Sequence, residues 1–269
     1  MKELNLNELT TEKRNPETMN LDEMGINEII EVMNHEDLKV VDAVRGVLPK
    51  VAQIIKLTTK SLETGGRIIY IGAGTSGRLG VLDAVECPPT FGVDSDCVIG
   101  LIAGGERAFV KAVEGAEDNM ALGANDLKEI GVCENDTIVG LTASGRTPYV
   151  IGALTYAKSI GAATACIACN LNSEVSGYAD VAVEVETGPE VLSGSTRLKA
   201  GTAEKMILNM ISTVSMVGIG KVYKNLMVDV RQTNEKLIVR SENIVMQAVG
   251  CDRPTAKEAL LTAGGEAKT

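Results

Sequence analysis

Three short loops of the sequence combine glycines with hydroxyl side chains: Gly72–Arg78, Thr142–Pro148 and Ser193–Arg197. The first two follow β-type runs and precede helical ones. Glycines let backbone N–H groups converge, hydroxyls add hydrogen-bond donors, and a helix N-terminus favours a negative charge. Three such loops in one chain predict a binding site for a phosphate group on a small ligand.

The first loop also matches the G-x-G-x-x-G pattern of dinucleotide-binding proteins. That fingerprint needs an acidic residue near the end of the next strand to hold ribose hydroxyls. Here the next predicted strand ends in Leu101–Gly105, and Asp94 and Asp96 precede it. The sequence therefore disfavours a nicotinamide or flavin cofactor. A single Gly-Ser loop is typical of an ordinary strand-to-helix turn, so the phosphate site depends on the three loops together.

Carboxylates are the main candidates for proton transfer. The one histidine, His35, lies in a polar segment that we expect to be a solvated helix start far from the loops. Glu86 ends the helix that is predicted after the first loop, and Glu117 follows a glycine that can direct it into a cleft. From the pattern alone each is either a catalytic group or a surface acid, and Glu114 and Asp118 are equal rivals of Glu117.

Four basic residues accompany the loops, namely Arg78, Arg146, Arg197 and Lys199. Each can bind a phosphate, or it can cap a helix or pair with an acid. The sequence pattern leaves both roles open.

The composition limits the partners and the compartment. A net charge of −10 over 269 residues argues against nucleic acid, which needs a basic surface. The pair Cys166-x-x-Cys169 has no second pair to complete a zinc site, so the six cysteines are predicted to be structural thiols. We find no signal core and no stretch long enough to span a membrane, and we expect a cytoplasmic protein.

Short apolar runs rich in β-branched residues alternate with helical patterns, which predicts a doubly wound α/β fold with a parallel sheet. Strands are expected at 67–72, 97–102, 137–142, 163–168 and 181–185, and the helices between them at 77–86, 106–129 and 147–160.

Further helical segments flank this core. Residues 1–25 are polar and predict an extended arm, and residues 26–64 have helical periodicity that Pro49 is expected to bend or interrupt. After the third loop, helices are expected at 200–218, 232–249 and 253–263.

Eight sequence segments in order resemble the N-acetylmuramic acid 6-phosphate etherase family, and together they span nearly the whole chain. They are Gly72–Gly80, Glu86–Thr90, Ile102–Glu106, Glu114–Asp118, Ala143–Tyr149, Gly188–Thr202, Asn225–Val230 and Thr233–Leu237. The stretch Gly188–Lys205 also resembles a signature shared with the glucokinase regulatory protein.

The resemblance implies a sugar isomerase (SIS) fold, a three-layer α/β/α sandwich with a parallel sheet and additional C-terminal helices, in a homodimer. Three parts follow. Residues 1–64 would form an arm and helices on the core, 65–225 the phosphosugar-binding domain, and 226–269 a helical segment. Family members usually continue past Gly264-Gly265 into more helices, so this segment is expected to be truncated.

The resemblance further implies cleavage of the lactyl ether of N-acetylmuramic acid 6-phosphate, giving N-acetylglucosamine 6-phosphate and D-lactate. Glu117 would be the base that removes the C2 proton, and Glu86 the general acid for departing lactate. No metal or organic cofactor is expected. The predicted phosphate-binding residues are Gly74, Thr75, Ser76, Ser144, Gly145, Thr147, Ser193, Ser195 and Thr196.

Two other functions share these features. A sugar-phosphate isomerase on the same fold would need a base but no acid to expel lactate. A non-catalytic sensor would bind a phosphosugar and control a partner protein. The presence of both Glu86 and Glu117 favours the enzyme over the sensor.

Overall fold

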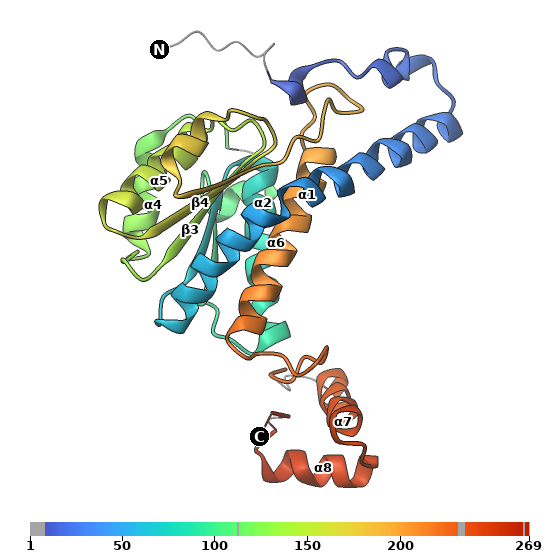
Figure 1. Ribbon diagram of the computed structural model, residues 1–269, viewed down its shortest axis with the longest axis vertical. Helices are drawn as coiled ribbons and strands as arrows, with labels where there is room; N and C mark the ends of the chain where they lie inside the picture. The colour runs from blue at the N-terminus through green and yellow to red at the C-terminus, as the bar shows by residue number, and fades with distance from the viewer. Residues whose placement is uncertain (1–8, 112, 231–234, 266, 269) are drawn as a thin grey trace.

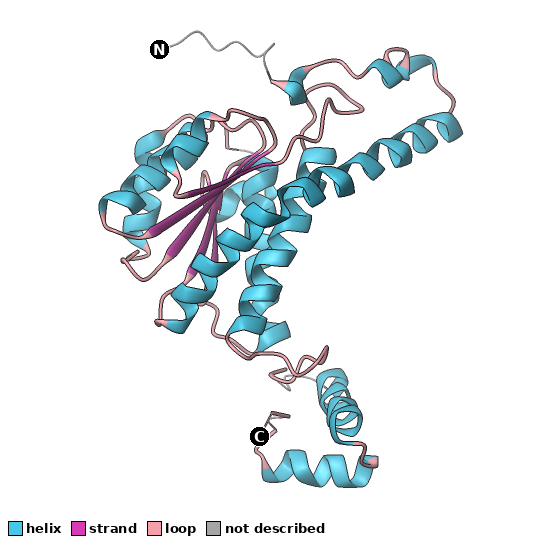
Figure 2. Ribbon diagram, viewed as in Figure 1, coloured by secondary structure: helices cyan, strands magenta, loops and turns pink. Residues whose placement is uncertain are grey.

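The computed structural model describes residues 9–111, 113–230, 235–265, 267 and 268. Its centre is a parallel sheet of five strands, shown in Figures 1 and 2. The strands occur in the order β2-β1-β3-β4-β5. They are β1 (Ile68–Gly72), β2 (Val98–Ile102), β3 (Thr137–Thr142), β4 (Ala163–Ala168) and β5 (Val181–Glu184). The five predicted strands are confirmed to within about one residue at each end.

Helices cover both faces of the sheet, which confirms the three-layer α/β/α sandwich. One core cluster joins the sheet to α1 (Ile26–Glu63), α2 (Gly74–Phe91) and α6 (Lys199–Gly218). The other joins it to α4 (Met120–Glu129) and α5 (Pro148–Ser159). Every residue of β1 and β3 is buried, as expected for strands covered on both sides.

Three prolines lie within continuous helices, including Pro49, which was predicted to bend or interrupt its helix. Helix α1 continues through Pro49, and α2 continues past Glu86 through Pro88 and Pro89 to Phe91. Pro49 is exposed, so the carbonyl that loses its N–H partner can be hydrated. His35 is exposed as expected, but it lies inside α1 rather than at a helix start.

The predicted helix at 106–129 was wrong in its middle. A short helix, α3 (Glu106–Val110), is separated from α4 by a loop. Helix α3 ends where Lys111 becomes extended, with φ of −132°, and Gly115 in the loop has φ of +75°, which a right-handed helix cannot contain. The break matters because it places Glu117 in a loop near the ends of the strands rather than on a helix face.

The described residues before α1 and after α6 lie outside the sandwich. The N-terminal arm contains three short 3₁₀ turns, Thr10–Glu12, Pro16–Thr18 and Leu21–Glu23, and another such turn, Glu174–Tyr178, precedes β5. The C-terminal helices α7 (Glu235–Val249) and α8 (Arg253–Thr262) pack against each other, away from the sheet (Figure 1). The start of the helix predicted at 232–249 falls partly outside the described residues.

Helices α4 and α5 approach so closely that glycine is required at the crossing. A Cβ atom at Gly152 would lie 1.9 Å from the carbonyl oxygen of Met120. A Cβ atom at Gly123 would lie 2.0 Å from the carbonyl oxygen of Tyr149. Both distances are far below van der Waals contact, so these helices owe their spacing to the absent side chains.

We predict that Gly152→Ala lowers the free energy of unfolding by about 2 kcal/mol or more, because the added methyl group must displace backbone. Gly46→Ala is the matched control, since a Cβ atom at this helical position meets nothing within 4 Å. The control should raise stability by about 0.5–1 kcal/mol. Urea unfolding of both variants measures this, and equal effects would contradict the tight crossing.

Candidate active site

The sheet order places two of the three loops side by side. Strands β1 and β3 are neighbours, and their connections lead to helices on opposite faces, α2 and α5. In such open sheets, ligands bind outside the carboxyl ends of the strands, at the point where the strand order reverses. The loops after β1 and β3 flank that point. The predicted phosphate-binding loops therefore meet at the edge where this fold favours a ligand.

The first loop delivers the N-terminus of α2 to this edge. Gly74 is the first helical residue, and Thr75 and Ser76 complete the first turn. The first N–H groups of a helix have no partner within it and can bind an anion. Gly77 must be glycine, because a Cβ atom there would lie 2.6 Å from the carbonyl oxygen of Gly72. The strand and helix thus join in a tight turn.

The second loop holds a cluster of hydroxyl groups. The Thr142 hydroxyl oxygen lies 2.7 Å from that of Thr147 and 3.3 Å from that of Ser144. It also accepts a hydrogen bond from the Gly145 N–H at 3.2 Å. Gly145 has φ of +73°, and a Cβ atom on it would overlap the Ser173 hydroxyl at 2.1 Å. This network fixes the shape of the loop that carries Ser144.

The third loop reaches the first one through the start of α6. A Cβ atom at Gly201 would lie 3.5 Å from the Thr75 methyl group, and the Gly201 N–H donates to the Thr196 carbonyl oxygen at 2.9 Å, so both residues lie beside this position. Ser195 and Thr196 are half-buried, and Ser193 is exposed. Residues from all three predicted loops therefore lie at the carboxyl edge or beside it.

Glu117 lies between the first two loops. It lines a cavity of about 180 Å³ together with Gly74, Arg78 and its rival Glu114, whereas Asp118 is not among the lining residues. The Glu117 carbonyl oxygen accepts a hydrogen bond of 3.0 Å from the Tyr149 N–H, in the first turn of α5. The loop that carries Glu117 is thus attached to the helix that follows the second loop.

Glu86 does not reach this cavity within one chain. It is exposed on α2, which starts at the carboxyl edge with Gly74 and runs away from it. At about 1.5 Å per residue, Glu86 lies about 18 Å along the helix from Gly74. Leu82 and Val85 beside it are also exposed. The two predicted catalytic glutamates are therefore not brought together by the fold of a single chain.

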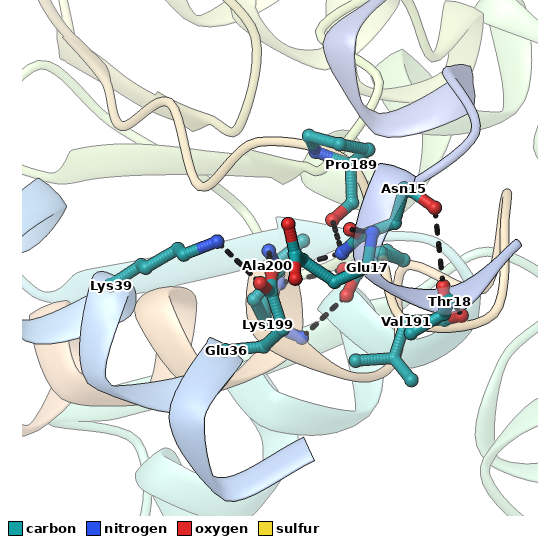
Figure 3. Close-up of polar contacts among 10 residues, drawn as sticks. Asn15, Glu17, Thr18, Glu36, Lys39, Pro189, Val191, Lys199 and Ala200 are labelled. Atoms are coloured by element: carbon teal, nitrogen blue, oxygen red, sulfur yellow. Dashed lines mark hydrogen bonds and ion pairs between the residues drawn. The ribbon is translucent and has the colours of Figure 1, made fainter. Parts of the chain in front are cut away.

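A buried ionic network fixes the approach to the third loop (Figure 3). The Lys199 ammonium donates to the Glu36 carboxylate at 2.6 Å, and each side chain is 1% exposed. Asn15 donates to Glu36 at 2.9 Å and to the Pro189 carbonyl oxygen at 3.3 Å. Burial alone would raise the pKa of Glu36, but hydrogen bonds from Lys199, Lys39 and Asn15 lower it to about 2. The arm, α1 and α6 are thereby joined.

A second buried acid caps the N-terminus of α6. The Glu190 carboxylate, fully buried, accepts hydrogen bonds of 2.9 Å from the N–H groups of Lys199 and Ala200. This helix end is therefore already occupied by a side chain and is not offered to a ligand.

Two of the four basic candidates have structural partners. Lys199 pairs with Glu36, and Arg78 donates to the carbonyl oxygens of Ala108 and Phe109 at 2.8 and 2.9 Å. Arg78 also lines the cavity, so its position is fixed there. A phosphate-binding role for Arg146, which is half-buried, and for Arg197, which is exposed, stays a prediction.

A buried carboxyl that was not predicted from the sequence lies below the first loop. Glu204 on α6 is 1% exposed and lies 2.8 Å from the Ser76 hydroxyl oxygen. Burial raises the pKa of Glu204 to about 8, against the weaker lowering effect of the Ser76 hydrogen bond. The signal was its spacing with Ala200, Ile207 and Ile211 on the buried face of α6, where an acid is unusual.

Three of the six cysteines, Cys87, Cys166 and Cys169, are buried as expected for structural thiols, whereas Cys97 and Cys251 are half-buried and Cys133 is exposed. Cys166 and Cys169 are fully buried, and burial raises the pKa of the Cys166 thiol to about 12. Such thiols are poor nucleophiles at neutral pH. Among the residues that the structure describes, no group of three or more His, Cys, Asp or Glu side chains is arranged to hold a metal ion. Nor does any described helix have the length and apolar character needed to cross a membrane.

Comparisons with known proteins identify the family. The glucokinase regulatory protein N-terminal SIS domain matches residues 50–158, and the SIS domain matches residues 130–213. N-acetylmuramic acid 6-phosphate etherases of Bacillus mycoides (strain KBAB4) and Bacillus cereus (strain G9842) are each 61% identical over 253 residues, which is 94% of this chain and 86% of theirs. The chain belongs to the N-acetylmuramic acid 6-phosphate etherase family.

Solved structures of other proteins have a fold similar to that of this chain. The phosphoheptose isomerase GmhA from Neisseria gonorrhoeae aligns over 71% of this chain and 98% of its own, with a TM-score of 0.54 and 16% identity. A phosphoheptose isomerase from Francisella tularensis aligns over 74% and 99%, with a TM-score of 0.52 and 16% identity. At these identities the likeness shows the SIS fold alone.

We predict that Lys199→Met lowers the free energy of unfolding at pH 7 by about 3 kcal/mol or more, because it leaves a buried carboxylate without its main partner. Lys39→Met removes the other lysine that pairs with Glu36, but Lys39 is 52% exposed. This control should cost less than about 1 kcal/mol. Urea unfolding distinguishes the two, and similar losses would contradict the structural role of the buried pair.

The same pair predicts a pH dependence. The folded pKa of Glu36, about 2, is below its ordinary value of 4.5, so its stabilising effect is complete above pH 4.5 and is lost as the pH falls towards 2. The stability difference between wild type and Lys199→Met should therefore shrink over that interval. A constant difference would contradict the ionised state of Glu36.

Proposed function

We propose that the chain cleaves the D-lactyl ether of N-acetylmuramic acid 6-phosphate, releasing D-lactate and N-acetylglucosamine 6-phosphate. The observation that carries the proposal is the 61% identity to etherases over 94% of the chain. The position of Glu117 in a cavity with the glycine loop supports it. Relatives at this identity favour an etherase over an isomerase or a sensor.

The phosphate is proposed to bind at the carboxyl edge of β1 and β3. The N–H groups at the start of α2 and the hydroxyls of Ser76, Ser144 and Thr147 supply the donors. Ser195 and Thr196 approach from the third loop. A phosphate carries about two negative charges at neutral pH, and hydrogen bonds to it are stronger than those between neutral groups. Fixing the phosphate orients the sugar ring relative to Glu117.

Glu117 is proposed to remove the C2 proton of the ring-opened sugar. The aldehyde at C1 makes this proton acidic, and the electron pair then expels lactate from C3. Water adds to C3 of the unsaturated aldehyde and completes the replacement of the ether by a hydroxyl. A base must be ionised and within hydrogen-bond reach of its proton. Glu117, exposed at the cavity, is open to water and to a sugar.

Glu86 is proposed to protonate the departing lactate oxygen, and its position implies a second copy of the chain. Glu86 lies too far along α2 to share a sugar with Glu117 of the same chain. The exposed Leu82 and Val85 beside it suit a buried contact with a second copy. We therefore propose a homodimer in which the Glu86 of one copy completes the site that contains the Glu117 of the other.

The reaction needs no redox step, and the proposed groups supply both proton transfers, so we propose that it proceeds without a cofactor. Six free cysteines fit a reducing compartment. We place the enzyme in the cytoplasm, where the sugar phosphate would be recycled.

We predict that Glu117→Gln and Glu86→Gln each lower the rate of D-lactate release by at least about 10²-fold, because each removes a proton-transfer group. Glu114→Gln is the matched variant for Glu117, since both acids line the cavity. It should lose less than about tenfold. A coupled D-lactate assay on purified protein measures all three. Near-wild-type turnover of a catalytic variant, or a larger loss in Glu114→Gln, would contradict the assigned roles.

We also predict that Ser144→Ala raises KM for the phosphosugar by about tenfold or more, because a hydrogen bond to a charged group contributes about 1.5–3 kcal/mol. Ser195→Ala should also raise KM. Ser159→Ala is the control, since this hydroxyl donates to the Tyr156 carbonyl oxygen at the far end of α5. Equal reactivity of a substrate that lacks the phosphate would show that the loops do not bind it.

A further inference from the structure

Glu204 lies directly below the proposed phosphate site. Its Oε1 atom is 2.8 Å from the hydroxyl oxygen of Ser76, in the first turn of α2. Its Oε2 atom is buried and has no hydrogen-bond partner among the residues that the structure describes. One turn earlier on α6, the Gly201 N–H donates to the Thr196 carbonyl oxygen at 2.9 Å, and a Cβ atom on Gly201 would lie 3.5 Å from the Thr75 methyl group. The carboxyl is therefore beneath the junction of the first and third loops.

No cation is bonded to this carboxyl in the described part of the chain. The next residue on α6, Lys205, donates instead to Asp83 on α2 at 2.8 Å, and Lys199 donates to Glu36 on α1. Arg78, two residues after Ser76 on α2, donates to the carbonyl oxygens of Phe109 and Ala108. Other buried titratable groups on this side of the sheet do not supply a positive charge; they include Tyr70 on β1, Cys87 on α2, Cys169 after β4 and Glu190 before α6.

A neutral carboxylic acid fits these surroundings better than a carboxylate. An ionised buried carboxylate needs a cation or several donors, and Glu204 has one hydroxyl. Burial raises its pKa to about 8, so that most molecules carry a proton on Glu204 at pH 7. A protonated carboxyl has an O–H group and can donate a hydrogen bond as well as accept one.

The protonation state of Glu204 decides what Ser76 can do. A serine hydroxyl has one proton to donate. If Glu204 is ionised, Ser76 must donate that proton to it and presents only lone pairs to a ligand. If Glu204 is protonated, it can donate to the Ser76 oxygen, and the Ser76 proton is free to point at an anion. The distance of 2.8 Å suits either direction.

We propose that Glu204 is a positioning residue that, when it carries a proton, turns the Ser76 hydroxyl into a donor for the sugar phosphate. Loss of that proton withdraws the donor and places a buried negative charge beneath the anion. Binding of the phosphosugar and the proton on Glu204 thus support each other. The inference rests on the proposed function, because it assumes that the first loop binds the phosphate.

The test is the pH dependence of binding of N-acetylglucosamine 6-phosphate, measured by calorimetry from pH 6.5 to 9. Using this product separates binding from the chemistry of Glu117 and Glu86. The second pKa of a phosphate is about 6, so its own titration is nearly complete before Glu204 loses its proton. With a pKa of about 8, the dissociation constant of wild type should rise up to about tenfold between pH 7 and pH 9.

Glu204→Gln should bind with nearly the wild-type pH 7 affinity at every pH, changing less than about twofold. Its side-chain amide never ionises, and the N–H₂ group can donate to Ser76 as the protonated carboxyl does. Asp126→Asn is the matched control. Burial also raises the pKa of this acid. Asp126 lies on α4 and accepts a hydrogen bond from the Tyr149 hydroxyl on α5, away from Ser76. This control should keep the wild-type pH dependence.

If the dissociation constant rises equally with pH in wild type and in Glu204→Gln, the inference is overturned, while the etherase activity is unaffected. If Glu204→Gln does not fold, Glu204→Met provides the same test, because it also removes the ionisable group and leaves the Ser76 proton free. A pH dependence in Glu204→Met equal to that of wild type would overturn it as well. D-lactate release by wild type is measured alongside, and its absence would contradict the proposed function instead.

Discussion

Burial of the central strands on both faces constrains where a polar ligand can bind. The backbone groups of β1 and β3 are hydrogen-bonded to neighbouring strands, and the side chains of these two strands lie in the two cores. The first N–H groups of α2 and the hydroxyl groups of the second loop lie where the strands end. Because all five strands are parallel, their ends share one edge, and the reversal between β1 and β3 separates the helices there. The glycine and hydroxyl loops, Glu117 and the cavity all follow from this one arrangement.

Buried charges then fix the third loop, which the sheet does not hold. Lys199 and Glu36 join α6 to α1, Asn15 links both to the N-terminal arm, and Glu190 closes the start of α6. Replacing such a pair by apolar residues can be neutral for stability, but it would remove the direction that hydrogen bonds impose. These contacts therefore position the loop of Ser195 and Thr196 as well as stabilising the fold, and they place α6, with Glu204, directly against the first loop.

The strands and most helices could be predicted from the sequence because buried parallel strands give short apolar runs between glycine-rich turns. The continuity of α1 through Pro49 could not, since it depends on exposure and on packing against α6. The pattern found the loops and Glu117, but it could not exclude Asp118, because a local pattern does not show which acids line a cavity; Glu114 and Glu117 both do. The partners of Glu36 and Glu204 come from distant parts of the chain, so only the fold reveals them.

Glu117 and Glu86 of one chain face different surroundings, so the chemistry depends on where the sugar binds relative to each. A crystal structure of the protein with N-acetylglucosamine 6-phosphate tests this most directly. We expect the phosphate at the carboxyl edge between the loops of Ser76 and Ser144, with C2 of the sugar facing the Glu117 carboxylate. We also expect the Glu86 of a second copy near C3. A phosphate bound away from this edge, or a sugar whose C2 faces away from Glu117, would contradict the proposed function.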